Sequence, residues 1–190
     1  MIKRDDAIVS IAQALSAELE RLRFSRYSDY SRLHSLLISK PEIIFDRFGG
    51  EHTHYAERLL QKAFSKAYFS LTKNCNLFDM KKVFVSACQH AYVVPNIAYS
   101  LHTHLEALKS SYREAFNAMA HILMTEPYIV FERFKLKVKI FPESLLGKIF
   151  EDRYQELVGD SDVDKKRQIF IATCRFLVRK RTYNGIFSDI

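Results

Sequence analysis

Two His-Thr-His triplets are the residues of this chain best suited by type to hold a metal ion. They are His52-Thr53-His54 and His102-Thr103-His104. Side chains two positions apart share a face of an extended strand but not of a helix, and the second triplet falls in a segment with helical spacing. No cysteine or carboxylate completes either triplet at a recognised metal-site spacing. The sequence therefore predicts solvent-facing histidines, no metal site and no cofactor.

An arginine precedes the first triplet at a spacing that also occurs in a nuclease family. Arg47 and His52 form an R-x4-H pattern. This pattern resembles the short motif of HEPN-type ribonucleases, which are all-helical, and the resemblance implies an RNA-cleaving site at these two residues. Phe48 follows the arginine where that family usually has a polar residue, and lysines rather than a histidine follow the matching Arg133. A HEPN-like ribonuclease is the third of three functions that the sequence leaves open.

No other segment matches a known catalytic pattern. The chain has no glycine-rich phosphate loop, no G-x-S-x-G and no nucleophile beside an obvious base. Its three cysteines, Cys75, Cys88 and Cys174, are widely spaced and odd in number, which favours free thiols in a reducing compartment. There is no run of 18 apolar residues. We therefore assign no catalytic residue, favour a binding protein over an enzyme, and expect a cytoplasmic location without a membrane span.

The charge of the chain favours an acidic partner. Its 29 Lys and Arg residues outnumber 22 Asp and Glu residues, for a net charge of +7. Seven basic residues and no acidic one lie between Lys165 and Arg181. On a helix, Phe170, Cys174 and Leu177 are expected to point inward. The opposite face then carries Lys165, Arg175 and Arg179 as a stripe suited to phosphates, although a solvated helix face is the ordinary alternative. The predicted nucleic-acid site is Lys165, Lys166, Arg167, Arg175, Arg179, Lys180, Arg181, Lys135, Lys137 and Lys139, the last three in a segment, 135–141, that we expect to be extended.

Two binding functions stand ahead of the ribonuclease. The first is a nucleic-acid-binding subunit or regulator that uses the basic last helix. The second is a protein–protein adaptor or assembly factor of a larger complex. Its partner would dock on the tail, 183–190, which carries several apolar residues, or in a groove between the two halves of the chain.

The elements that position these residues come in two copies. Residues 41–48 (PEIIFDRF) return as residues 127–134 (PYIVFERF), which lie 86 positions later, and the same offset pairs matching apolar residues on both sides. Apolar residues recur at helical spacing throughout. The sequence therefore predicts an all-α protein, a tandem duplication of a roughly 86-residue four-helix unit packed into one body. Its parts are unit 1 over 1–95, unit 2 over 96–182, and the tail over 183–190.

Local signals divide each unit further. Residues 24–30 interrupt the apolar spacing and predict a loop. Ser39 and Glu42 fit a capping box, so the repeated octapeptide opens a short helix or kinks a longer one. Arg47 is expected to bond helix-end carbonyls or an acid such as Asp46 or Glu57. The expected core anchors are Phe45, Phe48, Phe131 and Phe134.

Overall fold

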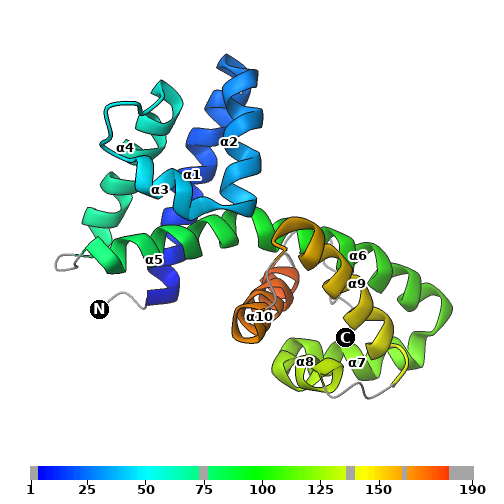
Figure 1. The fold of residues 1–190 in the computed structure, drawn as a ribbon. Helices are drawn as coiled ribbons and strands as arrows, with labels where there is room; N and C mark the ends of the chain where they lie inside the picture. The colour runs from blue at the N-terminus through cyan, green and yellow to red at the C-terminus, as the bar shows by residue number, and fades with distance from the viewer. Residues whose placement is uncertain (1–3, 73–76, 136–139, 160–161, 180–190) are drawn as a thin grey trace. The chain divides into compact units, whose positions relative to one another are not determined.

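The computed structural model describes residues 4–72, 77–135, 140–159 and 162–179, and within these ranges every regular element is a helix (Figure 1). The all-α prediction is confirmed. None of the described helices is long and apolar enough to cross a membrane. The chain divides into two compact units, Met1–Tyr92 and Val93–Ile190.

Unit 1 is built on its first helix. This helix, α1, packs against the second, fourth and fifth helices and buries an apolar face that includes Ile11 and Leu15. That burial is what stabilises a helix whose sequence is otherwise rich in charge. The helices are α1 (Arg4–Ser25), α2 (Tyr27–Ser39), α3 (Pro41–Arg47), α4 (Tyr55–Leu71) and α5 (Leu77–Cys88), followed by a π-helical turn, η1 (Gln89–Val93).

Unit 2 has the same succession of helices. Its first helix, α6, packs against α7, α9 and α10, as α1 packs against α2, α4 and α5 in unit 1. The helices are α6 (Val94–Ser111), α7 (Arg113–Thr125), α8 (Pro127–Lys135), α9 (Glu143–Leu157) and α10 (Val163–Arg179). Each unit thus has five α-helices over its described residues rather than the predicted four, because the repeated octapeptide forms a helix of its own.

Two local predictions are wrong. The loop expected over residues 24–30 is a single break at Arg26, with α1 ending at Ser25 and α2 beginning at Tyr27. The capping box does not form either, since the Ser39 hydroxyl donates to the carbonyl of Ser35, four residues back. Lys40, with φ −144°, takes the cap position of α3, and Pro41 begins the helix, where no backbone N–H is needed. Of the segment 135–141, residues 136–139 lie outside the described residues.

Aromatic rings fill the core of unit 1. Phe64 of α4 meets Phe84 of α5 at 5.1 Å between ring centroids, and both side chains are fully buried. Phe48 and Phe45 contact Phe84 at 5.2 Å and 5.6 Å from the octapeptide side. These edge-on and tilted contacts are the geometry that aromatic pairs favour, so the rings fasten α3 to α4 and α5.

The core of unit 2 has the same set of ring contacts. Phe150 meets Phe170 at 5.1 Å, and Phe134 and Phe131 contact Phe170 at 5.3 Å and 5.8 Å. Gly147 of α9 makes room for this arrangement, because a Cβ atom there would lie 2.7 Å from the ring of Phe134. The predicted anchors therefore lie at the core, with Phe131 buried and Phe45, Phe48 and Phe134 partly buried.

Candidate functional site

The basic residues predicted at the start of α10 are engaged by acidic partners. Lys166 Nζ donates to Glu151 Oε2 of α9 at 2.6 Å. Arg167 Nε donates to Glu132 Oε1 of α8 at 2.8 Å, and its Nη1 donates to Asp164 Oδ1 at 2.9 Å. The pairs with Glu151 and Glu132 connect α10 to α9 and α8, whereas the pair with Asp164 lies within α10. They also neutralise part of the charge that the predicted phosphate site requires.

The other predicted residues are less constrained. Lys165 is half-buried and makes further interactions, whereas Arg175 and Lys135 are exposed and form no ion pair with the described residues. Lys137, Lys139, Lys180 and Arg181 lie outside the described residues, as does the side chain of Arg179. The predicted inward face of α10 is confirmed, since Phe170, Cys174 and Leu177 are buried.

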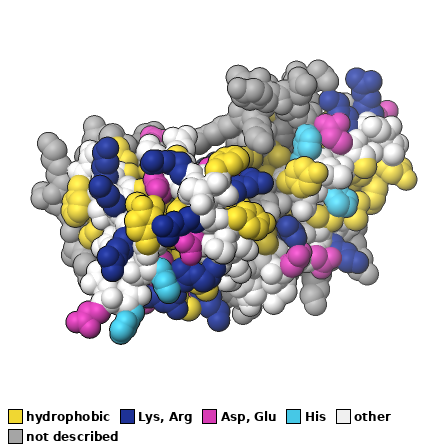
Figure 2. Space-filling view, turned by 90° about the horizontal axis from the view of Figure 1, so that it is seen from above, with side chains coloured by type: hydrophobic (Ala, Val, Ile, Leu, Met, Phe, Trp, Pro, Cys, Tyr) yellow, Lys and Arg dark blue, Asp and Glu magenta, His cyan; other side chains and the backbone are white. Residues whose placement is uncertain are grey.

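A basic groove between α1 and α4 of unit 1 was not part of the predicted site. It has a volume of about 820 Å³, and Glu18, Arg21 and Ser25 line it on the α1 side. In the face of the molecule shown in Figure 2, lysine and arginine side chains are interspersed with exposed hydrophobic side chains. We call the groove between these two helices the α1–α4 groove. The α4 residues that line it recur every three or four positions, as one face of a helix requires, and include Tyr55, Leu59, Lys62, Lys66 and Ser70.

Small side chains keep the groove open. Ala14 of α1 and Ala63 and Ala67 of α4 also line it. A methyl side chain leaves space between two packed helices that a longer one would fill. Unit 2 has larger residues at all three of the matching positions, which are Ser100, Ile149 and Arg153.

The charge in this groove is predominantly positive. Lys62 and Lys66 are exposed and form no ion pair with the described residues. Arg21 Nη1 lies 3.3 Å from Glu18, one turn earlier on α1, and the Arg26 guanidinium lies 4.6 Å from the centroid of the Tyr55 ring. Four cations therefore line the groove with one carboxylate.

Unit 2 does not repeat this charge. The residues 86 positions after Arg21, Arg26, Lys62 and Lys66 are Ala107, Tyr112, Lys148 and Asp152. Comparing the two copies at that offset shows this difference in charge in the sequence, but the predicted site followed the longer basic run of α10. The groove itself comes from α1 and α4, which pack together although they are far apart in sequence.

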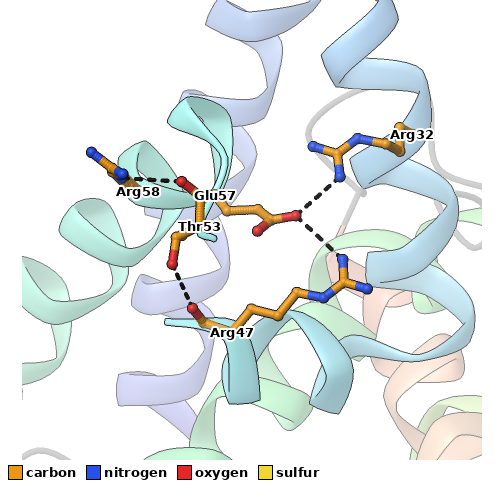
Figure 3. A network of polar contacts seen from close by, with 5 residues as sticks. All are labelled: Arg32, Arg47, Thr53, Glu57 and Arg58. Atoms are coloured by element: carbon orange, nitrogen blue, oxygen red, sulfur yellow. Dashed lines mark hydrogen bonds and ion pairs between the residues drawn. The ribbon is translucent and has the colours of Figure 1, made fainter. Parts of the chain in front are cut away.

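Arg47 belongs to an ion-pair network around one buried glutamate (Figure 3). Glu57 of α4 is fully buried, and its Oε1 accepts from Arg32 Nη1 at 3.1 Å and from Arg47 Nη1 at 3.5 Å. The Thr53 hydroxyl donates to the Arg47 carbonyl at 2.7 Å. The network joins α2, α3 and the start of α4, so among the partners expected for Arg47 the structure shows Glu57, in a structural role.

The matching pair in unit 2 has fewer members. Arg133 Nη1 donates to Glu143 Oε1 at 2.6 Å, and the Glu143 side chain is 6% exposed. Ala118 stands where unit 1 has Arg32. Glu143 therefore depends on a single arginine among the described residues, whereas Glu57 has two.

The histidine triplets are not assembled into a site. The side chains of His52 and His54 are exposed and have no hydrogen bond or ring contact with the described residues, including Arg47. His102 and His104 lie on α6, and the His104 ring contacts the Ser100 carbonyl. Over the part of the chain that the structure describes, no three His, Cys, Asp or Glu side chains come together as metal ligands would.

The described cysteines are poor nucleophiles. Cys88 and Cys174 are free and buried, and burial raises the pKa of both thiols well above the ordinary value. A thiol must ionise to attack or to bind a metal, so these two side chains act as small apolar groups in the core.

Comparisons of this chain with protein-family models, with curated proteins and with solved structures find no match. The geometry and charge of its own residues are therefore the basis for a function.

Proposed function

We propose that this protein binds nucleic acid through the phosphate backbone, with the α1–α4 groove as its principal site. The observation that carries the proposal is an open groove lined by four cations, two of them lysines without an ion pair among the described residues. Cations that stay hydrated and unpaired are available to replace the counterions of a phosphate backbone. The exposed Arg175 is a second proposed contact.

The proposal predicts a strong dependence on salt. Each phosphate neutralised contributes a slope of about −0.7 to −0.9 to the plot of log K against log salt concentration. A site that engages two to four phosphates should therefore show a slope of about −1.4 to −3.6. Fluorescence anisotropy of a labelled oligonucleotide, titrated at several salt concentrations, measures this slope.

A matched pair of variants tests the site. Lys62→Glu with Lys66→Glu should weaken oligonucleotide binding about tenfold or more at low salt, because attraction becomes repulsion inside the groove. Lys40→Glu with Lys148→Glu changes the net charge equally at two exposed positions that do not line the groove and is the control. Equal losses for both double variants would contradict the assignment of the groove. Wild-type protein that binds no oligonucleotide at low salt would contradict the function.

A protein adaptor is the second candidate. Phe24, Phe69 and Tyr99 are large side chains with most of their surface exposed, and such rings are enriched where proteins meet. Single exposed hydrophobic residues are nonetheless common on monomers. The adaptor takes precedence if the oligonucleotide experiment fails. The HEPN-like ribonuclease remains third, and labelled RNA recovered intact after prolonged incubation would exclude it.

We also propose that the two units arose by tandem duplication of one segment. The repeated octapeptide, the matching ring contacts and the matching Arg–Glu pairs support this origin. Features shared by the two copies would then serve folding, and features of one copy, such as the basic groove, would serve function. An experimental structure in which Phe45 and Phe131 have different neighbours would contradict the duplication.

The cytoplasm is the proposed location. Cys88 and Cys174 are free thiols in the core, which suits a reducing compartment. Fractionation that recovers the protein outside the cytoplasm would contradict this assignment.

A further inference from the structure

We propose that the α1–α4 groove takes a single strand rather than a duplex, with a base stacked on Tyr55. The inference rests on the proposed function and adds the class of nucleic acid and the residue that recognises it. A single strand has phosphates, which cations bind, and unpaired bases, which stack on aromatic rings.

Tyr55 is placed and oriented as a stacking platform. It is the first residue of α4, lines the groove, and has 55% of its surface exposed. The Arg26 guanidinium lies 4.6 Å from its ring centroid, a cation–π contact that holds the ring in place. An exposed ring held by a neighbouring cation loses little further freedom when a base stacks on it.

More exposed rings lie near Arg26. Phe24 and Tyr27 flank it closely in sequence, at the break between α1 and α2, and are 87% and 69% exposed. Rings interspersed with arginines are typical of proteins that bind single strands, because every base has a face that can stack. Bases inside a duplex are already stacked and cannot reach such rings.

The lysines of α4 provide for the phosphates. Lys62 and Lys66 are one helical turn apart, about 6 Å along the axis, and lie about 10 Å and 16 Å from Tyr55 in the same direction. The groove thus has a ring at one end and cations along its length. Axes of packed helices are about 8–10 Å apart, so a groove between them suits one strand better than a duplex, whose major groove alone is about 12 Å wide.

Unit 2 provides a matched control for the ring. Phe141 stands 86 positions after Tyr55 and is also exposed, but its neighbour is the Tyr112 ring, at 5.3 Å between centroids. An aromatic residue can therefore be removed from the equivalent position without touching the basic groove.

The experiment compares binding of a labelled 20-nucleotide single strand and of the corresponding duplex by fluorescence anisotropy at low salt. We expect the single strand to bind at least tenfold more tightly. Tyr55→Ala should weaken single-strand binding roughly 5- to 100-fold, the range for losing one stacked base. Tyr55→Phe should stay within about threefold of wild type, because the ring remains. Phe141→Ala should have no effect, and circular dichroism verifies that each variant folds.

Photocrosslinking supplies a direct readout. A strand that carries 5-iodouracil should crosslink to the peptide containing Tyr55. Equal binding of duplex and single strand, or an unchanged affinity of Tyr55→Ala, overturns the stacking inference. The proposed function survives that result if the Lys62→Glu, Lys66→Glu variant still loses binding. Binding to anionic phospholipid vesicles, with no binding to either oligonucleotide, overturns both.

Discussion

The two arginines of the repeated octapeptide should differ in their effect on stability, although they hold equivalent positions. Arg133 is the one arginine that pairs with the buried Glu143 among the described residues. Replacing it with alanine leaves that carboxylate without a counterion, which costs about 3–5 kcal/mol for a buried pair. Arg133 is about one-third exposed. Water can therefore reach part of the vacated space, so we expect a loss near the lower end, about 3 kcal/mol.

Arg47→Ala should cost much less. The Arg47 Nη1 atom lies 3.5 Å from Glu57 Oε1, at the limit of a hydrogen bond, and Arg32 remains at 3.1 Å as a second counterion. Loss of a weak bond with the charge still compensated costs about 1 kcal/mol. The two single variants should therefore differ by about 2 kcal/mol. The double variant Arg32→Ala, Arg47→Ala removes both counterions and should approach the effect of Arg133→Ala.

Urea unfolding followed by circular dichroism at 222 nm measures these differences. Because two compact units can unfold separately, hydrogen exchange of amides in α8 and α9, and in α3 and α4, locates each effect. Ala118→Arg should recover part of the stability of Arg133→Ala, since it places an arginine where unit 1 has Arg32. Equal destabilisation by Arg47→Ala and Arg133→Ala would refute the reasoning that a second counterion protects Glu57.

Two further variants test the core. Gly147→Ala should destabilise unit 2 by about 1–3 kcal/mol, because the added Cβ atom would lie 2.7 Å from the Phe134 ring, and Phe134→Leu in the same chain should restore part of the loss in urea unfolding. His34 has a pKa below its ordinary value through burial, with Glu20 raising and Arg23 lowering it to a smaller extent. The unfolded chain therefore binds a proton at His34 more readily than the folded protein does, so the free energy of unfolding should fall as the pH drops through about 6.5. Urea unfolding at pH 7.5 and 5.5 should show a smaller fall for His34→Gln than for wild type. An equal fall in both proteins would exclude His34 as the source of the pH dependence.

Residue spacing along one helix is local information, and predictions based on it were mostly successful. The inward face of α10 was predicted from the sequence, and Glu57 was one of the partners expected for Arg47. The predicted loop over residues 24–30 is wrong. These polar and aromatic residues form the end of α1 and the start of α2, which are separated only at Arg26. Propensity is a weak signal that packing of α1 and α2 overrides.

The candidate site depended on contacts that spacing does not reveal. From the sequence, Lys165, Lys166 and Arg167 are expected to be available to a phosphate. In the structure Lys166 pairs with Glu151, and Arg167 pairs with Glu132, from two other helices. Arg21 and Lys62 belong to different helices, and nothing in either helix alone indicates that they share a groove.

The sequence by itself determined that this chain is helical and that one pattern of apolar residues occurs twice, because helix periodicity depends on neighbours three and four positions away. Only the tertiary structure decided which charges are neutralised and which remain available to a ligand. That outcome depends on the packing of α10 beside α8 and of α1 beside α4, which brings together side chains from distant parts of the sequence.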